Sequence, residues 1–287
     1  MAEEEDSGKV FFPLGLVPAA DHATVAALGS GVRRKLLIHS LHVYLEFTAD
    51  LEQSIVNPVT HQISRQRLGV ELPPEMEEDA YKIYVDEAWH SRFSDDLQRQ
   101  IECATEVPRV RCSYPVFMER LAHIEHRLRG PDRHMARIFF AIISETLISS
   151  FLAKIPSDAS VVQPVRDMVS DHAVDEGRHH AYFSQLLRWL WPALNGRERA
   201  LIGDLLPEFI HAFLEPDVRA VTTMLVDCGL DRQQIEEVVL DVYKDWDKSG
   251  IIEISARHTV KHLAEVGVFA DSKTRESFQE AGLLGQL

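Results

Sequence analysis

The sequence predicts an all-α protein in which four long helices form a bundle, with further helices after it. Prolines divide the chain into stretches of helical periodicity, and four of these stretches are about 23 to 30 residues long, well above the usual mean for helices in globular proteins. Alternating apolar runs, the signal for strands, are short and few. Long helices without strands are typical of a helical bundle.

The prolines also set the expected boundaries. The first long helix is expected from Ser30 to Asn57, because Pro58 pushes the residue before it out of helical geometry. The other three are expected over residues 75–105, 132–154 and 164–190, with a shorter helix after Pro115. We expect a single domain over 1–287, in which 1–12 is a loose acidic tail, 30–190 is the bundle, and 194–287 is an extension with helices such as 197–214, 232–247 and 252–266.

Composition limits the function classes. The chain has 30 Lys and Arg against 45 Asp and Glu, a net charge of −15, which argues against nucleic acid or an anionic membrane as a partner. No apolar run reaches the roughly 18–20 residues of a membrane span, and the acidic N-terminus does not suit a signal peptide. The three cysteines form no CxxC pair, so we expect a cytoplasmic protein without disulfides or thiolate metal sites.

Two copies of Asp-Glu-x-x-His occur inside the long predicted helices. They are Asp86-Glu87-Ala88-Trp89-His90 and Asp175-Glu176-Gly177-Arg178-His179. Residues three apart share a helix face, so each Glu and His can reach one metal site from the same side. Two such pairs, with one Glu from each of two other helices, are the di-iron or di-manganese carboxylate arrangement of four-helix bundles.

The apolar faces identify further members of the site. On the helix after Pro164, the apolar face is interrupted only by His172, Glu176 and His179. Glu145 is the only acid in the apolar run 138–148. Charged and imidazole groups on a buried face are costly unless a partner stabilises them, so these residues are candidate ligands.

The first helix offers two carboxylates. Glu52 shares a face with Leu41, Leu45 and Ile55, whereas Glu46 lies on a polar face. Periodicity therefore favours Glu52. The complete set of candidate metal ligands is Glu52, Glu87, His90, Glu145, His172, Glu176 and His179.

Four carboxylates and three imidazoles without thiolate suit two iron ions, with manganese or zinc as alternatives. Asp86 and Asp175 lie beside the ligands and are expected to accept the second ring N–H of a metal-bound histidine.

The second motif resembles the D-E-x-R-H pattern of ferritin-like di-iron oxygenases. His172, four residues before Glu176, is similar to the seventh ligand of the p-aminobenzoate N-oxygenase family, and the Glu52–Glu87 and Glu145–His172 intervals are also similar to that family. The likeness covers roughly residues 35–190. It implies a ferritin-like bundle and a di-iron centre that uses O2 to oxidise amines. Several members of that family act in natural-product pathways.

The sequence favours an O2-dependent oxygenase that acts on a small amine, and we expect an aryl amine. Because no flavin or nicotinamide fingerprint is visible, its electrons are expected from an external donor or from the substrate. Three alternatives remain: a di-iron C–H hydroxylase or desaturase, a ferroxidase or iron-handling protein without an organic substrate, and a helical scaffold without metal. The long amphipathic helices are also compatible with a homodimer.

Overall fold

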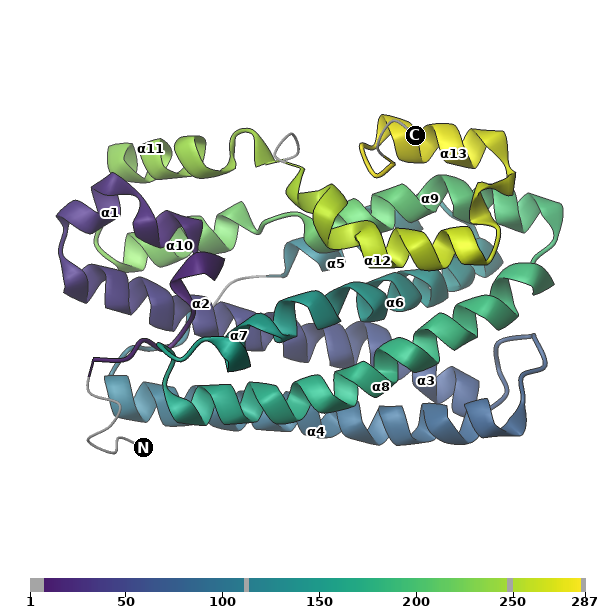
Figure 1. Cartoon of the computed structure of the whole chain (residues 1–287), viewed down its shortest axis with the longest axis horizontal. Helices are drawn as coiled ribbons and strands as arrows, with labels where there is room; N and C mark the ends of the chain where they lie inside the picture. The colour runs from purple at the N-terminus through teal and green to yellow at the C-terminus, as the bar shows by residue number, and fades with distance from the viewer. Residues whose placement is uncertain (1–7, 111–113, 247–249, 285–287) are drawn as a thin grey trace.

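The computed structural model describes residues 8–110, 114–246 and 250–284, and these residues form an all-α fold (Figure 1). The four long helices are α2 (Ser30–Leu51), α4 (Pro74–Thr105), α6 (Gly130–Leu152) and α8 (Gln163–Ala193). Helix α2 packs against α4, α6 packs against α8, and α4 and α8 lie side by side. The predicted all-α fold with a ferritin-like four-helix core is confirmed.

The sequence predicts that the first helix ends before Pro58, but in the structure the chain remains helical beyond this residue. It continues through a π-helical turn (Glu52–Val56) into α3 (Asn57–Ser64). In this turn the Asn57 N–H donates to the carbonyl of Glu52, five residues earlier. A proline ring in a regular α-helix clashes with the carbonyl four residues before it, and we attribute the tolerance of Pro58 to this wider turn. The predicted boundary is therefore wrong.

The remaining bundle boundaries differ from the prediction by only a few residues. Helix α4 begins with Pro74 in its first turn, where the missing N–H costs nothing, and Glu75 and Glu77 lie close to the positive end of the helix dipole. Pro192 is contained in the last turn of α8. The short helix α1 (Ala23–Ala27) precedes α2, and the short helices α5 (Val116–His126) and α7 (Lys154–Ser157) lie between the later long ones.

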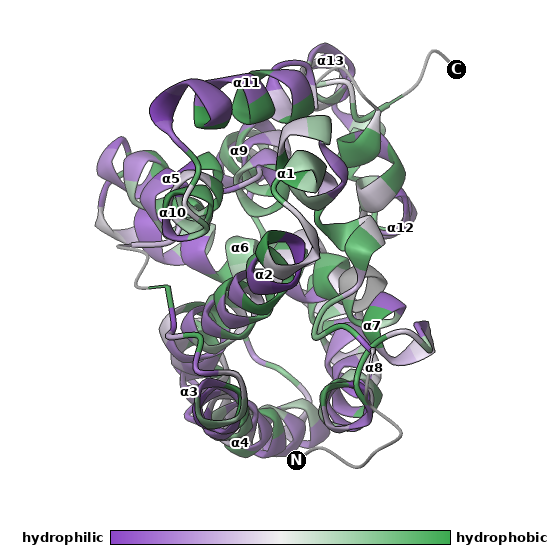
Figure 2. Cartoon of the chain, turned by 90° about the vertical axis from the view of Figure 1, so that its left-hand side faces the viewer, coloured by the Kyte–Doolittle hydropathy of each residue, from purple (hydrophilic) through white to green (hydrophobic). Residues whose placement is uncertain are grey.

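Five helices follow the bundle within the described residues. They are α9 (Gly196–Leu214), α10 (Val218–Asp227), α11 (Arg232–Tyr243), α12 (Ile251–Glu265) and α13 (Ser272–Glu280). Figures 1 and 2 show them on the side of α2 and α6 that faces away from α4 and α8. Helices α9 and α12 pack on α6. Helix α6 is thus covered from both sides, which explains why residues 138–148 are apolar almost all round.

The N-terminal segment is more ordered than expected. Val10 pairs with Val161 in an isolated β-bridge, and Phe11 and Phe12 are buried. The prediction of a loose tail is wrong for residues 10–12, because these apolar side chains join the core. Residues 1–7 lie outside the described part of the chain.

None of the helices in the described ranges is both long enough and apolar enough to cross a membrane.

Candidate metal centre

All seven candidate ligands lie in the interior of the bundle. Their exposed fractions range from 0% to 5%. They come from the four core helices: Glu52 from the π-helical turn that follows α2, Glu87 and His90 from α4, Glu145 from α6, and His172, Glu176 and His179 from α8.

The two carboxylates of the first helix have different surroundings. Glu52 is the first residue of the π-helical turn and is buried. Glu46 is exposed and accepts a hydrogen bond from the side-chain amide of Gln98 at 3.2 Å. Only Glu52 faces the other candidate ligands, which agrees with the choice made from periodicity.

Six of the seven residues form two overlapping groups. One group is Glu52, His90, His172 and Glu176, and the other is Glu87, His90, Glu176 and His179. Within each group, one nitrogen or oxygen atom from every residue lies within 4.8 Å of the others. His90 and Glu176 belong to both groups, so the two candidate positions for a metal ion are adjacent.

The atom that joins the two groups is Glu176 Oε1. It lies 3.2 Å from His172 Nε2 and 3.1 Å from His179 Nδ1. On the first group's side, His172 Nε2 is also 3.2 Å from Glu52 Oε1. On the second group's side, His179 Nδ1 is 3.3 Å from Glu87 Oε1. The centre therefore has one carboxylate between two nitrogen-and-oxygen sets.

Glu145 is the fourth carboxylate of the interior and belongs to neither group. Burial raises its pKa well above the usual range, and Glu176 and Glu87 raise it further. Its surroundings on α6 are almost entirely apolar. A carboxyl group in this position is stabilised by a nearby cation or by protonation.

Some oxygen atoms of the buried carboxylates lack a hydrogen-bond partner. Glu145 Oε2 and Glu176 Oε2 are inaccessible to solvent and accept no hydrogen bond, whereas Glu52 Oε1 and Glu87 Oε1 each contact a histidine nitrogen, at 3.2 Å and 3.3 Å. Each unpaired buried acceptor costs about 1–3 kcal/mol, a penalty that a bound metal ion would remove. Carboxylate oxygens and imidazole nitrogens are the donors that divalent iron or manganese prefers, and the residues present fit such ions.

The histidines and carboxylates also shift one another's protonation. Burial lowers the pKa of His172, but its contacts with Glu176 and Glu52 outweigh burial and raise it to about 10. The same balance, with Glu176 and Glu87 as partners, raises the pKa of His179 to about 12. Burial raises the pKa of Glu52 to about 7, although the nearby His172 opposes this. The carboxylates thus favour positive charge at both histidines, as they would favour a bound metal cation.

Asp86 and Asp175 contact the outward-facing nitrogens of two histidines, each across the gap between α4 and α8. Asp86 Oδ2 on α4 is 3.4 Å from His179 Nε2 on α8. Asp175 Oδ2 on α8 is 3.4 Å from His90 Nε2 on α4. An acceptor at Nε2 favours the tautomer with its proton there, which leaves Nδ1 free for a metal. The expected role of both aspartates therefore has the required geometry.

Ser91 and Gln53 complete the surroundings and were not predicted from the sequence. The Ser91 hydroxyl donates to Glu52 Oε2 at 2.9 Å, and the Gln53 amide donates to Ser91 Oγ at 2.9 Å. These bonds fix one oxygen of Glu52 and leave the other facing the histidines. Neither residue belongs to a recognisable spacing, so only the packing of the first helix on α4 reveals them.

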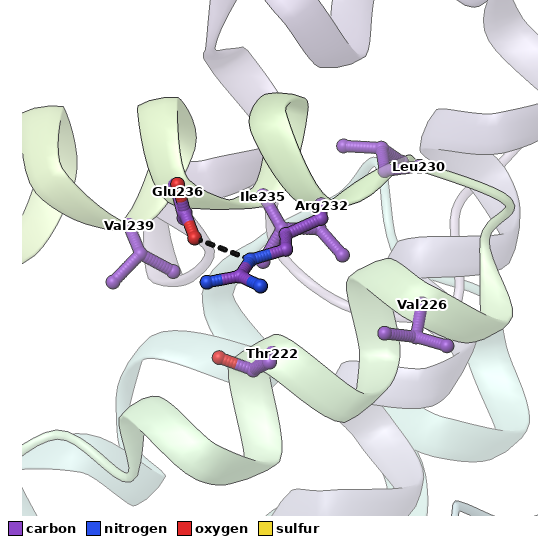
Figure 3. A pocket seen from close by; sticks show the side chains of 7 residues that line it. All are labelled: Thr222, Val226, Leu230, Arg232, Ile235, Glu236 and Val239. Atoms are coloured by element: carbon purple, nitrogen blue, oxygen red, sulfur yellow. Dashed lines mark hydrogen bonds and ion pairs between the residues drawn. The ribbon is translucent and has the colours of Figure 1, made fainter.

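A cavity of about 280 Å³ between α4 and α8 reaches the candidate centre, since His90 and His172 form part of its wall. Phe93, Leu97 and Met168 contribute apolar surface to the same wall. A larger cavity of about 410 Å³ lies between α10 and α11, where Arg232 and Glu236 form an ion pair at 2.8 Å (Figure 3). The larger cavity is lined by none of the candidate ligands, so the smaller one is the candidate substrate site.

Comparison with known proteins agrees with this geometry. The family model described as P-aminobenzoate N-oxygenase AurF matches residues 2–267, well beyond the range over which the sequence motifs indicated a likeness. A 4-aminobenzoate N-oxygenase from Streptomyces thioluteus is 25% identical over 237 residues, which cover 80% of this chain and 69% of that protein. The chain belongs to the p-aminobenzoate N-oxygenase AurF family of enzymes.

Proposed function

We propose that this chain is a non-haem di-iron N-oxygenase that uses O2 to oxidise an aromatic amine. The observation that carries the proposal is the pair of overlapping buried groups that share His90 and Glu176. Two adjacent metal ions need a separate ligand set each and a ligand between them, and this arrangement supplies both. Family membership supports the reaction type, and the relative's name supports an aromatic amine as the substrate class.

The ligand assignment follows the two groups. Glu52 and His172 would hold one ion, Glu87 and His179 would hold the other, and Glu176 would bridge them. His90, which belongs to both groups, would donate its Nδ1 to one ion, and Glu145 would supply the fourth carboxylate. Four carboxylates offset the charge of two divalent ions, which makes burial of the ions tolerable. We assign iron, with manganese as the alternative.

When bound, two iron ions supply the redox chemistry with O2. The protein contributes orientation and exclusion of water. Asp86 and Asp175 hold two imidazoles in the tautomer that leaves Nδ1 free, and the apolar side chains of α6 keep the centre dry. The cavity beside His90 and His172 would place the amine next to the centre.

The first oxidation converts an amine, O2, two electrons and two protons into a hydroxylamine and water. One oxygen atom of O2 forms the new N–O bond, and the other leaves as water. The two electrons are assigned to an external donor, because the sequence carries no fingerprint of a bound flavin or nicotinamide. Further rounds would give nitroso and nitro products.

C–H hydroxylation or desaturation would use the same centre, but family membership favours oxidation at nitrogen. A ferroxidase needs no cavity for an organic molecule, so the cavity at His90 and His172 favours an organic substrate.

The test is oxidation of 4-aminobenzoate and related anilines by protein loaded with Fe(II) without oxygen and then exposed to isotopically labelled O2 and a reductant. We expect labelled oxygen on nitrogen, detected by mass spectrometry, and loss of this product in the Glu176→Ala protein. Label on carbon would indicate a hydroxylase. O2 consumption without an oxidised product from any amine would indicate a ferroxidase.

A further inference from the structure

Among the side chains that line the cavity beside the candidate centre, the carboxylates of three aspartates outnumber the two histidines of the centre. Asp96 of α4 and Asp171 and Asp175 of α8 line the cavity, and no lysine or arginine does. The whole chain has a net charge of −15, so the surrounding protein does not reverse this sign. A small molecule that enters between α4 and α8 therefore meets a negative potential.

The three aspartates differ in how far they are already neutralised. Asp175 is 2.7 Å from Arg178 and also contacts His90. Asp96 is 3.7 Å from Arg92, an exposed pair of the kind that contributes little. Asp171 is exposed and makes no hydrogen bond or ion pair with any residue of the described chain. Asp171 is thus the carboxylate most available to a ligand.

The rest of the wall suits an aromatic ring. Phe93, Leu97 and Met168 provide apolar and polarisable surface, and Trp89 stacks on Phe93 with ring centroids 5.6 Å apart. A volume of about 280 Å³ is near the lower end of the usual range for small-molecule sites, which is appropriate for one ring with short substituents.

We propose that the substrate is a single-ring aromatic amine that also carries a cationic group, such as an amidinium or ammonium, recognised by Asp171 with Asp96. The proposal rests on the N-oxygenase function proposed above and adds the charge of the substrate to it. The reacting amine would lie on the side of His90 and His172, and the ring would contact Phe93 and Met168. An anionic amine such as 4-aminobenzoate, the compound in the relative's name, would be disfavoured at this wall.

Three compounds of the same shape isolate the effect of charge: 4-aminobenzamidine is a cation, 4-aminobenzamide is neutral and 4-aminobenzoate is an anion. Dissociation constants are measured by equilibrium dialysis with the full chain, loaded with Mn(II) so that no turnover occurs. We expect the cation to bind most tightly and the anion most weakly. The difference should shrink as salt rises, because exposed charges are screened over about 10 Å at 0.1 M salt.

Variants on one helix locate the effect. Asp171→Asn should lower the preference for the amidine over the neutral benzamide by about fivefold, the factor for one pair of unit charges about 4 Å apart in water. Asp171→Lys should lower it by about 25-fold, because it replaces attraction with repulsion. Asp167→Asn is the matched control, since Asp167 lies one turn earlier on α8, is exposed, accepts from Gln163 and does not line the cavity. Its preference should equal that of the wild type.

These experiments distinguish an error in the proposed substrate charge from an error in the proposed N-oxygenase function. If the wild-type protein binds 4-aminobenzoate as tightly as the amidine, or if Asp171→Asn leaves the preference unchanged, the proposed substrate charge is wrong even when N–O products form. If the binding order holds but the iron-loaded enzyme forms no N–O product from any of the three amines, the N-oxygenase function is wrong.

Discussion

Replacing Glu176 by alanine is expected to abolish binding of both metal ions, because its Oε1 lies between the two ligand groups. His172 Nε2 is 3.2 Å from this oxygen on one side, and His179 Nδ1 is 3.1 Å from it on the other. A residue that served one ion alone would remove only half of the metal-dependent stability. The position of Glu176 therefore predicts a larger effect than that of His172 or His179, each of which belongs to one group.

The expected rise in Tm on metal loading follows from two metal sites per chain. A ligand that binds only the folded state at 100 times its Kd stabilises it by about 2.7 kcal/mol, so two ions add about 5.4 kcal/mol. For 287 residues, the unfolding entropy near the transition is about 0.6 kcal/mol/K, and the Tm should rise by about 9 °C on loading. If the variant binds 100-fold more weakly, the same metal concentration raises its Tm by only about 1 °C.

Single-group variants and a control make the series quantitative. His172→Ala affects only the group with Glu52, and His179→Ala affects only the group with Glu87, so each should retain about half of the rise in Tm and one ion per chain. Glu46→Ala removes an exposed carboxylate outside both groups and should behave as the wild type.

The assay is thermal unfolding followed by circular dichroism, with and without Mn(II) or anaerobic Fe(II), and metal content measured on the same samples. If Glu176→Ala protein keeps two ions and its rise in Tm, the bridging position is wrong. If the Glu46→Ala protein loses its metal, the face of the first helix has been misassigned.

Three further predictions concern the centre and its support. Metal binding should release protons and strengthen between about pH 6 and pH 9, because the pKa values of His172 and His179 are raised to about 10 and about 12 and both residues must lose a proton to bind a metal. Calorimetry in buffers of different ionisation enthalpy measures the number of protons released, and a metal affinity independent of pH would contradict the prediction. Asp86→Asn should weaken metal binding by about 10- to 100-fold in a Mn(II) titration, because the His179 Nε2–H loses its carboxylate partner, and an unchanged affinity would show that this contact is incidental. Gly203→Ala should destabilise the fold by about 1–3 kcal/mol in urea unfolding, because the added Cβ would lie 2.3 Å from Thr274 Oγ1 where α9 meets α13. Adding Thr274→Ala to this variant should recover most of the lost stability.

Local sequence signals predicted the helices well and selected candidate ligands of which the structure groups six, because both depend on helix periodicity. Once a segment is helical, Glu87 and His90 must share a face, and so must His172, Glu176 and His179. Prolines at the first turns of α4 and α8 marked where these helices begin. The candidate ligand set thus needed no knowledge of how the helices pack.

Features that depend on packing between helices were not predictable in this way. The charge of the cavity arises because Asp96 on α4 and Asp171 on α8 face the same space. The periodicity of one helix does not determine its register against a neighbouring helix. Phe11 and Phe12 reach the core only because residues 160–162 offer a backbone partner to Val10.

Pro58 and Glu52 belong to one local feature of the first helix, the π-helical turn together with the start of α3. Proline lacks the N–H that would continue the regular hydrogen-bond ladder, and its ring needs space near the carbonyl of Ser54, four residues earlier. The π-helical turn that begins at Glu52 provides a wider ring there, closed by the bond from the Asn57 N–H to the Glu52 carbonyl. Such turns weaken a helix and persist mainly where a site requires them. The proline therefore indicates a change of helix geometry at the candidate ligand rather than the end of the helix.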